Sequence, residues 1–383
     1  MAASRQEAFV HDKRTRAIAV ITLVTICVSI GYWLFLWSTD VFLYWGVNLV
    51  GSRWLGAFVA CAALSTILIR PIPIKVITIA TINLVLFSLF ATILQQTLAR
   101  FSSPAATIGW IWQGGIAVIV CCIAVLVYGF FHGKLLVITR YTVDTPLPVN
   151  GGELLIALIS DVHMGMTIDE TRLRQQMDRL SAEKPDLLII AGDLVDDRTS
   201  PAQMQAACAI LGSLKTTYGT YFAYGNHDLA THGPKPPYSK AELDQALIEH
   251  GVHILDDQSL SIAGLAIIGR HDAAFSRNAK RATVEQLLDG VDKSKPIILV
   301  DHQPRELKES AAAGVTLHLS GHTHAGQVWP MSWFVRLVAF SYGHKCINGM
   351  HAIISAGMGN RGNVLRSGST AEMVLIRLRN ANG

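Results

Sequence analysis

Seven residues of types that bind metal ions follow short apolar runs in the second half of this 383-residue chain. The runs LLIALIS, DLLIIAG, YFAYG, PIILVD and VTLHLSG lead into these side chains, which are Asp161, His163, Asp193, Asn226, His302, His322 and His324. Short runs rich in Val, Ile and Leu are typical of strands buried on both faces. In layered α/β proteins the ligand crevice lies outside the carboxyl ends of such strands. The sequence therefore predicts that the five clusters meet at one point, which binds metal.

The predicted ligands mix nitrogen and oxygen donors, with two carboxylates, one amide and four imidazoles. One ion needs fewer ligands, and the set suits two ions about 3.5–4 Å apart that share a bridging carboxylate. Asp, His and Asn together suit Mn, Zn or Fe, whereas oxygens alone would suit Mg or Ca. Gly192, Gly225 and Gly321 adjoin ligands, and glycine allows close backbone approach to a crowded site. A helix cap or a turn explains one such cluster, but five at consecutive strand ends favour a metal centre.

The ordered motifs SDVH, GDLVD, GNHD, DHQP and SGHTHAGQ resemble the motif set of the calcineurin-like metallophosphoesterases. The resemblance covers residues 135–380 and is strongest to the bacterial membrane-associated YaeI/YkuE-type branch, which is related to the chlamydial UDP-2,3-diacylglucosamine pyrophosphatase. The tail ISAGMGNRGNVLRSGSTAEMVLIRL is also similar to that branch. One departure is Ala325, where the branch usually has Gly. This residue lies beside the ligands and is not one of them.

The resemblance implies a dinuclear centre with a defined ligand set. One ion would be held by Asp161, His163, Asp193 and His324, and the other by Asp193, Asn226, His302 and His322. Mn is the expected metal, and Zn and Fe are the alternatives. His227 would protonate the leaving oxygen or contact the phosphate, and Asp228 would orient it. A metal-bridging hydroxide would then attack phosphorus in line.

Four further side chains are candidates for contact with the substrate. Arg361 and Arg366 either bind a substrate phosphate through their planar donors or pair with Glu372. Trp329 and Trp333 belong to the apolar segment VWPMSWFVRLVAF, residues 328–340. This segment is either packed in the core or forms a partly exposed apolar wall that meets a membrane surface and admits an acyl chain.

The first third of the chain differs in composition. Hydrophobic residues make up 51% of the sequence, and most of the excess lies before residue 132. A hydrocarbon core is crossed by about 20 apolar residues. We therefore expect a tail at residues 1–16, a transmembrane anchor at 17–132 with four spans near 17–37, 50–69, 76–98 and 108–131, and a metallophosphoesterase domain at 133–383. The expected fold is a bundle of about four transmembrane helices plus an α/β domain, built as a layered β-sandwich flanked by helices.

Basic residues near the span ends predict the orientation of this anchor. One side would carry Arg5, Lys13, Arg14, Arg16, Arg70, Lys75, Lys134 and Arg140, and the other only Arg53 and Arg100. The expected location is therefore the bacterial inner membrane, with several spans and the catalytic domain in the cytoplasm. Six cysteines without a CxxC pattern agree with a reducing compartment. The net charge of +4 gives no indication of nucleic-acid binding.

These motifs predict a metal-dependent hydrolase of phosphodiesters or diphosphates that acts at the cytoplasmic membrane face on a lipid-linked substrate. One alternative is a membrane-anchored hydrolase of soluble nucleotides or phosphoproteins. Another is a scaffold or binding protein without catalysis, against which the retention of all seven ligands and His227 argues. The sequence gives no indication of the oligomeric state.

Overall fold

The computed structural model describes residues 32–43, 46–47, 52–53, 55–57, 59–60, 75–98, 115–228, 236–274 and 281–381. The chain divides into two compact units, Met1–Val127 and Tyr128–Gly383. The tail expected at residues 1–16, and most of the spans expected at 17–37 and 50–69, lie outside the described residues.

The transmembrane bundle expected before residue 132 is wrong. Among the residues that the structure describes, no helix has both the length and the apolar character needed to cross a membrane. Helix α5 (Ile116–His132) has 17 residues, or about 25 Å of helix, whereas a hydrocarbon core is about 30 Å thick. Helix α3 (Lys75–Leu98) has 24 residues. The same finding overturns the expected location as a multi-pass protein of the bacterial inner membrane with a cytoplasmic catalytic domain.

The unit Tyr128–Gly383 contains two mixed six-stranded sheets. The first sheet has the order β1 (Leu136–Thr145), β12 (Ala371–Asn380), β2 (Glu153–Ile159), β3 (Leu187–Ala191), β4 (Thr220–Ala223) and β5 (Val252–Ile254). The second has the order β10 (Gly343–Ile347), β11 (Met350–Ile354), β9 (Leu317–Ser320), β8 (Ile297–Val300), β7 (Leu265–Gly269) and β6 (Gln258–Ile262). Strands β2, β3 and β4 are parallel, and so are β7, β8 and β9. Loops that follow parallel neighbours leave the sheet at the same edge.

The two sheets pack face to face around one apolar core. Ile156 and Ile189 enter it from the first sheet, and Ile298 and Leu319 enter it from the second. All five residues of β3 are buried, as the run LLIIA predicts for a strand covered on both faces. The core therefore fixes the relative position of the two sets of strand ends.

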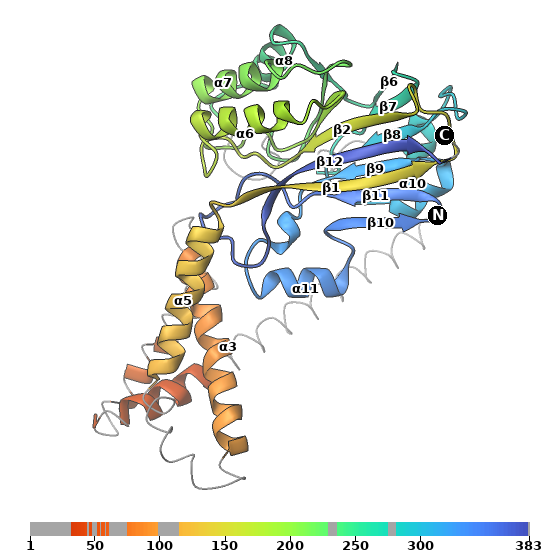
Figure 1. The fold of residues 1–383 in the computed structure, drawn as a ribbon. Helices are drawn as coiled ribbons and strands as arrows, with labels where there is room; N and C mark the ends of the chain where they lie inside the picture. Colours follow the sequence, from red (N-terminus) through yellow and green to blue (C-terminus); the bar gives the residue numbers. More distant parts are fainter. Residues whose placement is uncertain are drawn as a thin grey trace, which may run out of the picture. The chain divides into compact units, whose positions relative to one another are not determined.

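Helices cover the outer faces of the two sheets. Helices α6 (Glu170–Ala182), α7 (Pro201–Gly212) and α8 (Lys240–Glu249) lie together over the first sheet (Figure 1). Helices α9 (Val284–Leu287) and α10 (Leu307–Ala313) pack on the second sheet. Two short helices, η3 (His324–Gly326) and α11 (Met331–Val338), follow β9. The α/β part of the expectation, a layered sandwich flanked by helices, agrees with this architecture.

Candidate metal centre

Every predicted ligand lies just beyond the carboxyl end of a strand. Asp161 and His163 follow β2, Asp193 follows β3, Asn226 follows β4, His302 follows β8, and His322 and His324 follow β9. The loops also bind one another, since Asp161 N donates to Gly192 O at 2.9 Å and His163 N donates to Asp193 O at 3.1 Å. His322 N, from the second sheet, donates to Asp161 Oδ2 at 3.0 Å. The structure thus brings the ligand-bearing loops of both sheets to one place.

Asp161, His163 and His324 form the first group of candidate ligands, and all three are buried. His163 Nε2 lies 3.2 Å from His324 Nε2, which lies 3.5 Å from Asp161 Oδ1. On its other side His163 Nδ1 lies 3.6 Å from Asp196 Oδ2, a position from which this carboxylate orients the ring. Burial lowers the pKa of His324, and the positive charge of His163 adds to the effect. A neutral imidazole of this kind has a lone pair free for a metal ion.

Asp193, His302 and His322 form the second group. The rings of His302 and His322 meet edge to face with their centroids 5.1 Å apart. His302 Nδ1 lies 2.7 Å from the carbonyl oxygen of Ala191, and because a carbonyl only accepts, Nδ1 carries the proton and Nε2 faces the centre. Burial, followed by the charge of His302, lowers the pKa of His322 to about 4. Asn226, the remaining expected ligand, is buried just beyond β4.

Asp193 lies between the two groups. Its Oδ2 is 3.1 Å from His302 Nε2 and 3.8 Å from His163 Nε2, which belongs to the other group. Burial acts to raise the pKa of Asp193, but the charges of His302, His227 and His163 together hold that pKa well below its usual range. An ionised carboxylate between two groups of ligands is placed to bridge two cations.

Buried nitrogens test whether a metal fits these residues. His322 Nδ1 is buried and makes no hydrogen bond with any described residue. A buried polar atom without a partner costs about 1–3 kcal/mol. A cation supplies that partner, and the mixed N and O donors are those that Mn, Zn and Fe accept. The residues therefore fit two divalent ions.

The ligand loops have an unusual backbone. Positive φ angles, from 46° to 69°, occur at Asp161, His163, Asp193, His322 and His324. Such left-handed conformations cost about 1–3 kcal/mol each in non-glycine residues and concentrate at functional sites. Ala325 also has a positive φ, of 50°. A glycine at this position would relieve the strain, which gives a physical reason why the related branch usually has Gly there.

Two glycines permit the close approach of these loops. A Cβ atom on Gly225 would overlap the Asp193 carboxylate, and a Cβ atom on Gly321 would overlap the Asp161 carboxylate. Neither glycine has a positive φ angle. Glycine is needed at both positions because there is no room for a side chain, and not because of the backbone conformation. This agrees with the role expected for them from the sequence.

His227 and Asp228 occupy different positions around Asp193. His227 N donates to Asp193 Oδ1 at 2.7 Å, and its ring meets the His163 ring edge to face at 5.1 Å. Asp228 is fully buried and accepts hydrogen bonds from the backbone N–H groups of Asp193, Val195 and Gly225 at 2.8, 3.1 and 2.7 Å. These bonds tie the two ligand loops together. The expected action of Asp228 on the His227 ring stays a prediction.

The two candidate arginines differ in exposure. Arg361 is exposed, and its charge contributes to lowering the pKa values of His227, His322 and His324. Arg366 is fully buried and donates to the carbonyl oxygens of Gly359 and Ala356. Burial lowers the pKa of Arg366 to about 10. Of the two, only Arg361 is exposed, and its contact with a substrate stays a prediction.

Gln327 was not among the predicted site residues, yet it holds Arg361 in place. Its Oε1 accepts from Arg361 N at 2.8 Å, and its Nε2 donates to the carbonyl oxygens of Leu365 and Arg361 at 3.0 and 3.3 Å. Gln327 is the last residue of the motif SGHTHAGQ, and this position was the signal that could have identified it.

The apolar segment 328–340 forms a surface helix. Trp333 in α11 is 60% exposed, whereas Trp329 is half-buried and its backbone N–H donates to Ser367 Oγ at 3.0 Å. Ser332 and Pro330 are buried, but most of the remaining side chains of the segment are exposed. The segment is therefore partly exposed rather than packed in the core. Its contact with a membrane surface and an acyl chain stays a prediction.

Comparison with known proteins supports a family relationship. Residues 154–326 match the family described as calcineurin-like phosphoesterase. Among the similar relatives are uncharacterized metallophosphoesterases. One from Campylobacter jejuni is 29% identical over 258 residues, covering 66% of this chain and 67% of the relative. One from Helicobacter pylori is 34% identical over 233 residues, covering 59% of this chain and 60% of the relative. YkuE from Bacillus subtilis is 26% identical over 256 residues, covering 64% of this chain and 86% of YkuE. This chain therefore spans only 60% of the Helicobacter relative.

Proposed function

We propose that this chain, which carries a calcineurin-like metallophosphoesterase domain, hydrolyses a phosphodiester or diphosphate bond with the help of two divalent metal ions. The family expected from the five motifs is confirmed by the match at residues 154–326 and by the relatives named metallophosphoesterases. The observation that supports the proposed reaction most strongly is the pair of ligand groups on either side of Asp193. Mn is the proposed metal, and the donor set also accepts Zn and Fe.

The protein supplies fixed ligands and a dry, preorganised site. Two ions bound there would provide Lewis acidity at the scissile phosphate and neutralise the charge that develops on it. Asp161, Asp193 and His302 are fully or almost fully buried, so the field around the substrate is set by protein groups rather than by water.

His227 is the proposed general acid. Its backbone bond to Asp193 fixes it beside the proposed bridging ligand, and its Nε2 makes no hydrogen bond with any described residue. Burial lowers the pKa of His227, while the charge of Asp193 opposes that shift. A lowered pKa makes the protonated imidazole a stronger acid toward a leaving oxygen.

Arg361 is the proposed contact for the non-bridging phosphate oxygens. It is exposed, its charge acts on His227 and on two proposed ligands, and Gln327 fixes its backbone. A guanidinium suits this task because its parallel N–H groups match two phosphate oxygens.

A lipid-linked phosphate compound is the proposed substrate. What supports this is α11, which follows the His324 loop and exposes apolar side chains. Soluble nucleotides and phosphoproteins do not need such a surface.

The test compares substrate classes under several metals. The purified full chain is incubated with Mn²⁺, Zn²⁺ or Fe²⁺ and with an aryl phosphodiester, a lipid-linked diphosphate or a soluble nucleoside diphosphate, beside an Asn226→Ala control. We expect hydrolysis of the aryl diester and faster hydrolysis of the lipid-linked compound. Activity on none of the three above that of Asn226→Ala, under any metal, would overturn the hydrolase proposal. Preference for the soluble nucleotide would overturn only the lipid-linked substrate.

A variant of His227 tests the proposed proton transfer. His227→Asn should lower kcat by about 10²–10³-fold, because general acid catalysis contributes on this scale, while metal content stays unchanged. His253, an exposed histidine of β5, provides the matched control in His253→Asn. The loss should shrink for a substrate whose leaving group needs no proton. An equal loss for poor and good leaving groups contradicts the role.

A further inference from the structure

Most of the apolar side chains of helix α11 are exposed. Its exposed large apolar side chains are Met331, Trp333, Phe334, Leu337 and Val338, with exposed fractions from 48% to 81%. Single exposed apolar residues are ordinary, but a contiguous group on one element marks an interaction site.

The spacing places these side chains on one face. Trp333 and Leu337 are four residues apart, and so are Phe334 and Val338, so each pair lies on adjacent turns. The opposite side of the helix is attached through Ser332, which is buried and packs closely on Gly326 and Gly368. The apolar face therefore points away from the protein.

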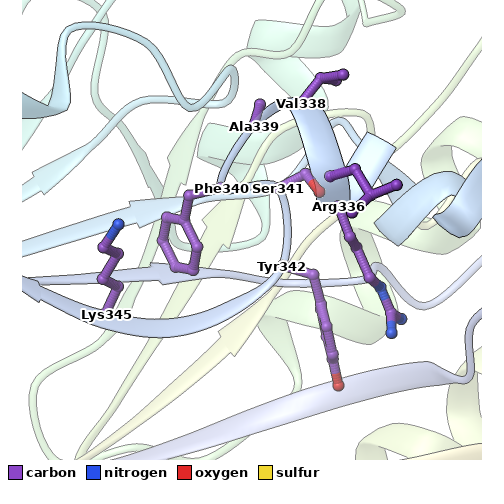
Figure 2. A pocket seen from close by; sticks show the side chains of 8 residues that line it. Arg336, Val338, Ala339, Phe340, Ser341, Tyr342 and Lys345 are labelled. Carbon is purple, nitrogen blue, oxygen red and sulfur yellow. The ribbon is translucent and has the colours of Figure 1, made fainter. Parts of the chain in front are cut away.

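Two cations border this face. A cavity of about 560 Å³ at the end of α11 is lined by Arg336, Leu337, Val338, Ala339, Phe340, Ser341, Tyr342 and Lys345. Figure 2 shows Arg336 beside Tyr342 and Lys345 beside Phe340. Arg336 Cζ lies 5.2 Å from the centre of the Tyr342 ring, and Lys345 Nζ lies 5.8 Å from that of the Phe340 ring. Neither cation forms an ion pair with an acidic group in the described part of the chain. Both remain available for a negative charge outside the protein.

We propose that α11 and this cavity form a docking surface for an anionic phospholipid layer. Aromatic and aliphatic side chains on one face of a short helix, bordered by Arg and Lys, are the features of a helix that lies in a lipid interface. Trp333 and Phe334 would enter the acyl boundary, while Arg336 and Lys345 would contact lipid phosphates. A helix of eight residues is too short to span a bilayer and would lie along its surface.

The position of α11 gives this docking a function. The helix packs against η3, whose first residue is the proposed ligand His324. Docking would therefore bring the metal centre close to phosphate groups at a lipid surface. This docking rests on the proposed function, which supplies the reaction, and it adds a lipid surface as the partner.

The test follows amide exchange within α11, because binding of the whole chain to vesicles could also come from other apolar segments such as α5. Hydrogen–deuterium exchange of the full chain is followed with vesicles of phosphatidylcholine alone and of phosphatidylcholine mixed with phosphatidylglycerol. We expect peptides that cover Met331–Val338 to exchange at least about tenfold more slowly with the mixed vesicles, as for helix amides removed from water. Peptides of α8, on the outer face of the first sheet, serve as the internal control.

Two double variants separate the apolar and the charged contributions. Phe334→Ser/Leu337→Ser should abolish the protection of α11 on both kinds of vesicle. Arg336→Gln/Lys345→Gln should remove the difference between mixed and neutral vesicles. Unchanged exchange of α11 in the wild-type chain, or equal protection in the Phe334→Ser/Leu337→Ser variant, would overturn the proposal. Protection that appears without vesicles and rises with protein concentration would also overturn it, because a second copy would then cover the face.

This result is separable from the proposed function. Hydrolysis of a soluble aryl diester by the wild-type chain does not require docking. Activity without protection of α11 therefore refutes the docking alone, whereas protection without activity refutes the hydrolase alone.

Discussion

Helix α11 follows the last ligand of the candidate metal centre, yet the two regions are opposite in character. The centre gathers carboxylates and imidazoles in positions that are almost fully buried, whereas α11 exposes Trp, Phe and Leu. Folding alone favours the reverse arrangement, since polar groups prefer water and apolar groups prefer the core. The buried polar groups of the centre cost stability unless cations bind them. The exposed apolar side chains of α11 cost little stability and, as we propose, serve to contact lipid.

The two regions should respond differently to mutation. In the centre each side chain has specific partners, and its backbone is held in left-handed conformations. In α11 most side chains have few partners within the protein. Substitutions in the centre should thus affect metal content and stability, while those in α11 should leave both nearly unchanged.

The largest effect is expected for Asp193. Asp193→Ala removes the carboxylate between the two ligand groups, so metal content should fall from two ions to one or none per chain. Activity should fall on the order of 10³-fold, the upper range for loss of one group that stabilises the transition state. Metal analysis by mass spectrometry and turnover of the aryl diester measure the two quantities. Asp197→Ala, in the same loop, is the control, and two retained ions in Asp193→Ala would contradict the bridging position.

An intermediate effect is expected for Asp228. In Asp228→Asn the side chain keeps its size, but one of its two acceptor atoms becomes a donor that faces a backbone N–H. We expect a loss of about 1–3 kcal/mol in the free energy of unfolding and metal affinity about 10–100-fold weaker. Urea unfolding and competition with a chelator measure these changes.

The control for this prediction is Asp178→Asn on the exposed face of α6, which should change stability by less than about 0.5 kcal/mol. Stability of Asp228→Asn equal to that of the control would show that the three backbone bonds do not hold the ligand loops.

The smallest effect is expected for α11. Leu337 is 65% exposed, so Leu337→Ala should change the free energy of unfolding by less than about 0.5 kcal/mol. The matched substitution Leu319→Ala, in the core between the sheets, should cost about 2–5 kcal/mol. Thermal unfolding of both variants measures the contrast. A large loss of stability in Leu337→Ala would mean that α11 packs against the protein, which would contradict the difference between the two regions.

The sequence predicted the α/β unit of the molecule better than its first third. Apolar runs with polar ends identify buried strands and the ligands after them, because a strand covered on both faces must be apolar and a functional loop must be polar. Composition alone misled before residue 132, since an apolar segment can form a helix too short to cross a membrane as well as a membrane span. The pattern could not separate these outcomes.

Individual side chains show the same limit. Arg361 and Arg366 lie five residues apart in one tail and looked equivalent as phosphate ligands, but only packing decides that Arg366 is buried against carbonyl oxygens. Asp228 follows His227 directly, yet its oxygens accept bonds from residues of two loops. Such choices depend on neighbours that are distant in sequence.

The sequence by itself determined which chemical groups the protein has, the order of its buried strands, and the family that this order indicates. The tertiary structure decided which groups meet, with Asp193 between two sets of imidazoles, and which face remains exposed on α11. The physical reason is that residue type and short-range periodicity are local properties. Proximity and burial result from the packing of two sheets whose strands are far apart along the chain.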